Sequence, residues 1–109
     1  MKFLCLAYGD EKQWNALSKS KQNALRAQDK VLRMNGHLVA EVQSATTVRF
    51  VDGKVLTAVG PFAQTKGKLA GFYLIEAKDL DEVIRLVSKT PCAQVGAFEV
   101  RPIEEIKQT

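Results

Sequence analysis

His37 and the loop from Gly60 to Lys66 contain the residue types best suited to chemistry in this sequence. His37 is the only histidine, and its side chain titrates near neutral pH, which makes it the default acid–base candidate. Glu41 shares the predicted strand face of His37, but four residues of extended chain span about 13 Å, too far for an acid–base dyad. We therefore favour a surface position for the His37 ring. Any acidic partner must come from another strand or from a second subunit.

The Gly60–Lys66 loop is the better candidate for a binding site. Gly60 and Pro61 fix a turn, Phe62 offers an apolar wall, and Thr65 and Lys66 supply a hydrogen-bond donor and a positive charge. These are the parts of a pocket for a small polar or anionic organic compound. The alternative interpretation, which stays open, is a structural turn that only shapes the entry to the next strand.

Tyr8 and Asp10 lie at the end of the predicted first strand and are the expected neighbours of this loop. Tyr8 is assigned to ligand binding, because clefts open at the ends of strands. Asp10 is the acidic residue best placed for proton transfer. Together with His37, it is one of two weak catalytic candidates. A structural explanation also exists for Asp10, since aspartate is common in turns.

Metals, cofactors and membranes are not indicated. Cys5 and Cys92 are the only two cysteines and do not have metal-ligand spacing. We expect reduced thiols, no metal and no cofactor. No apolar run approaches the roughly 20 residues that span a bilayer, and the Phe3–Ala7 run is too short for a signal peptide. The expected location is the cytoplasm.

Composition indicates one globular domain over residues 1–109. The hydrophobic fraction is 46% and the charged fraction 26%, as in folded proteins of this size. The formal net charge is +4, with positive side chains gathered between Lys12 and Arg33. We interpret this cluster as a solvated helix face, in preference to a surface for an anionic ligand or nucleic acid.

Hydrophobic periodicity and turn residues predict alternating strands and helices. Strands are expected at residues 2–8, 37–43, 46–51, 54–59, 70–77 and 97–101, and helices at 10–17 (a short turn), 19–34 and 79–89. Asp52-Gly53 predicts a type I′ turn between the third and fourth strands, because these residues accept positive φ.

Ser18 and Ser20 are candidate N-caps of the long helix. Its buried stripe is expected at Ala24, Leu25, Val31 and Leu32, and that of the last helix at Leu80, Val83, Ile84 and Val87. Pro91 is expected to stop that helix.

This order is the βαββαβ pattern of a ferredoxin-like α+β unit with an antiparallel sheet. Both helices of such a unit pack on one face, so the other face should be polar. On the first strand, however, Phe3 and Cys5 point to one face of the sheet and Leu4 and Leu6 point to the other, so both faces are apolar. Two-sided apolar strands need cover on both faces, which predicts a homodimer packed sheet to sheet, with an interface of ordinary size, about 1,600 Å².

Several segments together resemble the DGPF-type proteins of the YCII-related family. The longest match runs from Val59 to Lys66 and continues from Leu69 to Ala77. Shorter matches are at residues 8–11, 46–49, 52–54, 79–82 and 100–102. The resemblance covers most of the chain and implies a dimeric α+β barrel, the architecture that the apolar strand faces indicate independently.

The resemblance also suggests a chemistry. Some members of the family resemble lyases or isomerases that act on small ring-derived acids, with a proposed site of a histidine and an acidic partner. The aspartate that opens the DGPF motif is replaced here by Val59, whose side chain cannot exchange a proton. Enzymatic activity is therefore left open.

Two other function classes remain. RNA binding is the less favoured one: Lys68, Gly71 and Phe72 loosely match an RNA-recognition strand, but Ala70 and Ile75 stand where two further base-stacking aromatics belong. A sheet buried in a dimer also could not stack bases. The other class is a ligand-sensing or accessory module without catalysis.

Overall fold

The computed structural model describes residues 1–106 as four helices and six strands. In chain order these are β1 (Lys2–Gly9), α1 (Glu11–Ala16), α2 (Lys19–Met34), β2 (Leu38–Glu41), β3 (Thr46–Val51), β4 (Lys54–Val59), β5 (Lys68–Glu76), α3 (Leu80–Val87), α4 (Pro91–Val95) and β6 (Ala97–Pro102). Local signals set several of these bounds. The Ser18 side chain accepts a hydrogen bond from the Lys21 N–H, and Asp79 accepts one from the Glu82 N–H, so both residues are N-caps.

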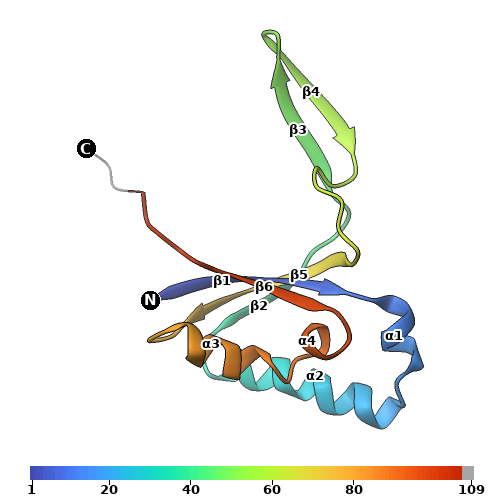
Figure 1. Ribbon diagram of the computed structural model, residues 1–109, viewed down its shortest axis with the longest axis vertical. Helices are drawn as coiled ribbons and strands as arrows, with labels where there is room; N and C mark the ends of the chain where they lie inside the picture. The colour runs from blue at the N-terminus through green and yellow to red at the C-terminus, as the bar shows by residue number, and fades with distance from the viewer. Residues whose placement is uncertain (107–109) are drawn as a thin grey trace.

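Four strands form an antiparallel sheet in the order β2-β5-β1-β6. The helices lie on one side of this sheet (Figure 1). If the β3–β4 hairpin is set apart, the remaining elements follow the ferredoxin-like order, with the first strand and β5 paired at the centre. The predicted α+β fold is therefore confirmed.

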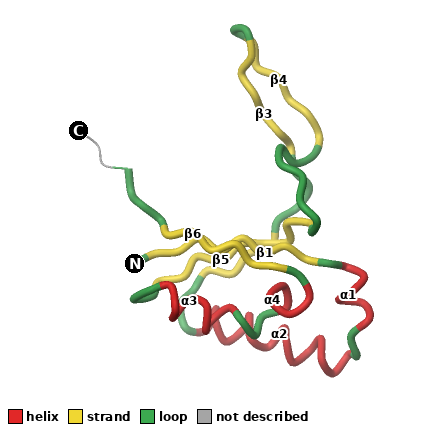
Figure 2. Tube along the Cα trace, in the orientation of Figure 1, coloured by secondary structure: helices red, strands yellow, loops and turns green. Residues whose placement is uncertain are grey.

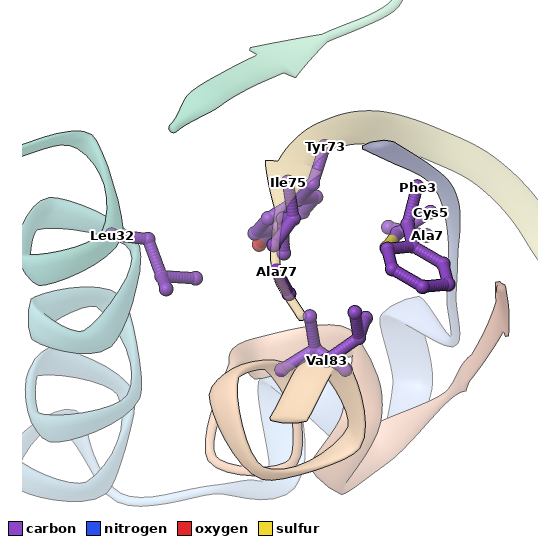
Figure 3. Close-up of a cluster of buried hydrophobic side chains, with 9 residues drawn as sticks. Phe3, Cys5, Ala7, Leu32, Tyr73, Ile75, Ala77 and Val83 are labelled. Carbon is purple, nitrogen blue, oxygen red and sulfur yellow. The ribbon is translucent and has the colours of Figure 1, made fainter. Parts of the chain in front are cut away.

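The hydrophobic core lies between the helices and this sheet. Phe3, Cys5 and Ala7 of β1 point into it beside Tyr73 and Ile75 of β5 (Figure 3). Helix side chains complete the cluster, namely Leu32 of α2 and Val83 and Val87 of α3. Burial raises the pKa of the Cys5 thiol to about 11, so this side chain stays neutral and behaves as a small apolar residue.

The opposite side of the sheet has no helix over it (Figure 1). Because side chains alternate along a strand, the residues between the core positions point to this side. Charged residues stand at the margins of this side, namely Lys2 and Glu76 at one end and Glu99 and Arg101 on the edge strand β6. Apolar residues, half-buried or exposed, lie between them: Leu4, Leu6, Tyr8, Leu38, Ala40, Phe72 and Leu74. We call this set the open sheet face.

Strands β3 and β4 form a separate two-stranded sheet that we call the arm. The arm projects away from the body, on the side of the sheet that the helices do not cover (Figures 1 and 2). Its strand bounds coincide with the predicted ones. Asp52 and Gly53 have φ angles of 50° and 76°, so the prediction of a turn with two positive φ angles is confirmed.

Two features of the helices differ from expectation. Ala24 and Val31 of α2 are exposed, as are Leu80 and Ile84 of α3. Each helix buries a narrower stripe than predicted, because it contacts the sheet along one line only and periodicity does not fix the rotation about the helix axis.

Pro91 was expected only to end the preceding helix, but it also begins α4. Proline suits the first turn of a helix, where its missing N–H is not needed by an intrahelical hydrogen bond. The additional helix packs against β1 and β6.

The burial of α3 yields a direct test. Val83 is fully buried, whereas its neighbour Ile84 is 50% exposed. We expect Val83→Ala to lower the free energy of unfolding by about 2 kcal/mol, through lost apolar burial and the cavity left behind. The matched variant Ile84→Ala should cost less than about 1 kcal/mol. Urea unfolding measures both, and equal losses would contradict the observed rotation of the helix.

Candidate functional site

The structure divides the Gly60–Lys66 loop into two parts. The first part, Gly60 to Phe62, is attached to the base of the arm. The Gly60 N–H donates to the Ala45 carbonyl at 2.9 Å, and the Thr47 hydroxyl donates to the Gly60 carbonyl at 2.7 Å. Gly60 has a φ of 114°, a conformation that favours glycine. These bonds fix the direction in which the chain leaves β4.

Phe62 and Pro61 form one wall of a shallow hollow beside β3. The guanidinium carbon of Arg49 lies 6.0 Å from the centroid of the exposed Phe62 ring, at the outer limit of a cation–π contact. The hollow is lined by Ala45, Thr46, Thr47, Val48, Arg49, Phe50, Pro61 and Phe62. Its lining does not include Tyr8, Thr65 or Lys66.

The second part of the loop lies at the end of the sheet, beside Tyr8. Lys68 pairs with Gly9 and Leu69 pairs with Tyr8. Gly67 packs so closely that a Cβ atom there would lie 3.0 Å from the Gly9 carbonyl oxygen and 3.2 Å from the Tyr8 Cβ. The backbone at Lys66 is thus held next to Tyr8.

Two proton-donating or accepting groups at this end already have structural partners. The Thr65 hydroxyl donates to the Gly67 carbonyl and closes the turn. The Asp10 carboxylate accepts the Gln13 N–H at 3.1 Å as the N-cap of α1. The Arg101 guanidinium, which is near enough to Tyr8 for their charges to interact, is paired with Glu99 at 2.8 Å. The Tyr8 hydroxyl and the exposed ammonium groups of Lys66 and Lys68 are the further polar groups of this corner.

His37 lies at the other end of the same sheet. Its backbone N–H donates to the Leu32 carbonyl at 3.1 Å, just past the end of α2. The next residue, Leu38, pairs with Leu74. Six residues of β5, about 20 Å of strand, separate Leu74 from Lys68. One chain therefore does not bring His37 together with the loop or with Asp10.

A polar pair that the sequence did not suggest lies between α2 and the sheet. The hydroxyl of buried Tyr73 donates to the Asp29 carboxylate, and the Phe98 ring packs edge-on against Tyr73 at 5.0 Å between centroids. The signal was the position of Asp29, which stands four residues after Leu25 and three before Leu32. A carboxylate within a buried helical stripe requires a partner.

This environment changes the pKa of three groups. Burial raises the pKa of Asp29, although the Tyr73 hydroxyl and Arg33 partly oppose the rise. Burial and the hydrogen bond to Asp29 raise the pKa of Tyr73. Burial and the Asp29 charge also raise the pKa of the Cys92 thiol, which disfavours the reactive thiolate. The hydrogen bond between Tyr73 and Asp29 links β5 to α2.

Residues 1–106 contain no cluster of three or more histidine, cysteine, aspartate or glutamate side chains arranged to hold a metal ion. Over the same residues, none of the helices is long and apolar enough to cross a membrane.

Known proteins resemble this chain in sequence and in fold. The sequence pattern of the YCII-related domain matches residues 1–107. An uncharacterised protein of Rhizobium meliloti is 33% identical over 114 residues, covering 94% of this chain and 92% of that protein. Among solved structures, 5-chloro-2-hydroxyhydroquinone dehydrochlorinase from Burkholderia phenoliruptrix, in complex with 2,5-dihydroxybenzoquinone, is similar with a TM-score of 0.50 and 18% identity. That match covers 95% of this chain and 94% of the other.

The Tyr73–Asp29 pair should make stability depend on pH. The folded-state pKa of Asp29 is raised above its ordinary 3.8, so the folded protein binds more protons than the unfolded chain just above that pH. The contribution of the Asp29 carboxyl group to the free energy of unfolding is complete below pH 3.8. This contribution is lost as the pH rises through the folded-state pKa of Asp29. In Asp29→Asn, which keeps an acceptor for the Tyr73 hydroxyl, this loss should disappear.

Urea unfolding between pH 4 and 7 measures this effect. Relative to Asp29→Asn, the unmodified protein should become less stable as the pH rises. Tyr73→Phe should cost about 1–2 kcal/mol at pH 7, because it leaves the half-buried carboxylate without its donor. Parallel pH curves for the unmodified protein and Asp29→Asn would show that the carboxyl group is not perturbed.

Proposed function

The chain belongs to the YCII-related family, and from that membership and the geometry above we propose that it is a domain that binds a small polar or anionic organic compound. The proposed site is the corner of the sheet where Tyr8 meets the segment from Thr65 to Lys68. The sequence also assigns Pro61 and Phe62 to the ligand, and in one chain these two residues line the separate hollow at the base of the arm.

The observation that best supports this site is the close packing of Gly67 on Tyr8 and Gly9. Lys66 and Lys68 flank Gly67 in the sequence, so this contact holds their backbones next to β1. Two ammonium groups and a phenolic hydroxyl suit a ligand that presents carboxylate or phenolate oxygens. The ring of Tyr8 offers a flat apolar surface for a planar ligand.

The structural relative supports the ligand class. That dehydrochlorinase was solved with 2,5-dihydroxybenzoquinone, a small ring with several oxygen atoms. Its oxygen atoms suit the positive charges of Lys66 and Lys68. A lyase or isomerase reaction on a ring-derived acid is the chemical extension of this proposal.

The candidate proton-transfer groups favour binding over catalysis within a single chain. Asp10 is engaged in capping α1, and His37 is at the opposite end of the sheet. Val59, which replaces the aspartate of the DGPF motif, is 95% exposed at the end of β4. An acid–base reaction would therefore need a group from a second subunit, and a non-catalytic ligand-sensing module remains the alternative.

The proposal includes a homodimer in the cytoplasm, packed through the open sheet face. Its apolar side chains, among them Leu6, Phe72 and Leu74, are the side chains that a second sheet would cover. RNA binding is disfavoured in that arrangement, because the same face would be buried.

Removal of the Lys66 charge tests the site. With 2,5-dihydroxybenzoquinone as the probe, we expect Lys66→Ala to weaken binding about tenfold, the loss of one charge-assisted hydrogen bond. The control, Lys54→Ala, removes another exposed charge, beside the arm turn, and should bind normally. Thermal shift at increasing probe concentration measures both, because binding to the folded state raises the melting temperature.

Two results would contradict the proposal. Equal probe affinities for the two variants would place the ligand elsewhere. A flat response to the probe and to a panel of small carboxylic acids, together with a shift on addition of single-stranded RNA, would favour the nucleic-acid alternative.

A further inference from the structure

The two faces of the arm differ in chemistry. Pairing of Val48 with Thr57, of Phe50 with Val55 and of Thr46 with Val59 places these residues on one face. The other face contains Arg49, Lys54 and Leu56, together with Thr47, Val51 and Ala58. The first face, which we call the apolar arm face, consists only of valine, phenylalanine and threonine.

This apolar arm face has no cover within the chain. Val48, Phe50 and Val55 are 66%, 73% and 65% exposed. A two-stranded hairpin alone is at best marginally stable in water, and exposed aromatic and β-branched residues at adjacent cross-strand positions mark an interaction surface. The arm therefore needs a partner to become a stable element.

The position of the arm limits what that partner can be. The arm rises on the side of the sheet that carries the open sheet face, away from the helices (Figure 1). The arm and the open sheet face therefore lie on the same side of the sheet, although they come from different sheets. A partner that covers the sheet from this side also reaches the arm.

The amount of exposed surface fits a second protein chain. The molecule exposes 8516 Å², whereas a compact monomer of 12.1 kDa exposes about 6,000 Å². The excess, about 2,500 Å², is larger than the roughly 800 Å² that each partner buries in a standard interface and is in the range of obligate homodimers. The radius of gyration is 16.2 Å, against about 13 Å for a compact chain of this length.

We propose that the apolar arm face packs on a second copy of this chain, so that each subunit clasps the other with its arm. A second copy is the occupant because an apolar surface on the same side is what the chain itself provides. In a two-fold pair, each copy offers its open sheet face and receives the arm of the other. The clasp adds to the sheet-to-sheet contact and does not depend on ligand binding.

The clasp has a consequence for the loop at the base of the arm. Val59 lies on the apolar arm face and is followed directly by Gly60, whose carbonyl and N–H are bonded to Thr47 and Ala45. A partner that fixes the arm also fixes the position of Pro61 and Phe62. Dimer formation and the shape of this loop are thereby linked.

Adjacent residues on opposite faces of β4 provide a matched test. Val55 lies on the apolar arm face and Leu56 on the other, and both are exposed in a single chain. Val55→Lys should weaken the dimer at least about tenfold, because a lysine replaces an apolar side chain in the buried contact. Leu56→Lys should dimerise as the unmodified protein does. Sedimentation velocity over a dilution series measures both dissociation constants, with circular dichroism as the check on folding.

Further variants keep the test decisive. If Val55→Lys lowers the melting temperature of the body, Val48→Thr, a milder loss of apolar area on the same face, replaces it and should also weaken the dimer. Leu6→Lys on the open sheet face should dissociate the dimer whether or not the arm takes part. Dissociation by Leu6→Lys but not by Val55→Lys would overturn the clasp and leave the sheet-to-sheet dimer intact. Equal dissociation constants for Val55→Lys and Leu56→Lys would also overturn the clasp. The apolar arm face would then bind a partner other than a second copy of this chain.

Discussion

The pairing of β1 with β5 at the centre of the sheet imposes the main constraint on this structure. Both strands are apolar on their two faces, with Phe3 and Cys5 on one side of β1 and Leu4 and Leu6 on the other. The helices cover one side only (Figure 1). The side with the helices gains a closed core, in which Ile75 and Val83 are almost fully buried. The other side keeps apolar groups at the surface, which is unfavourable in water unless a second surface covers them.

The arm and the loop follow from the same arrangement. Between β2 and β5, the chain leaves the sheet as a hairpin and must return so that Lys68 can pair with Gly9. This detour fixes one part of the loop to the arm through Gly60 and the other part to the sheet beside Tyr8. The relative position of the two parts of the loop therefore depends on the position of the arm.

Local signals made much of the fold predictable, and long-range ones did not. The Asp52-Gly53 pair predicts where the two hairpin strands end and that both turn residues have positive φ angles. Both properties depend on neighbouring residues only. The sequence does not reveal that the hairpin leaves the sheet, since its β propensity is the same in either place. The sequence does not indicate the partner of Asp29, because Tyr73 is 44 residues away. The rule that strand ends open into clefts grouped Tyr8 and Asp10 with the loop, and the register does pair Tyr8 with Leu69. No such rule applies to His37, which the structure places at the other end of the sheet.

Sedimentation equilibrium of the unmodified protein tests the central claim, that one chain cannot cover its own apolar surfaces. At micromolar concentration, the account predicts a mass twice the 12.1 kDa of the chain, with dissociation only on strong dilution. A folded protein that remains at the mass of a single chain throughout the same range would contradict the account. It would show that the open sheet face and the arm are stable in water without a second copy.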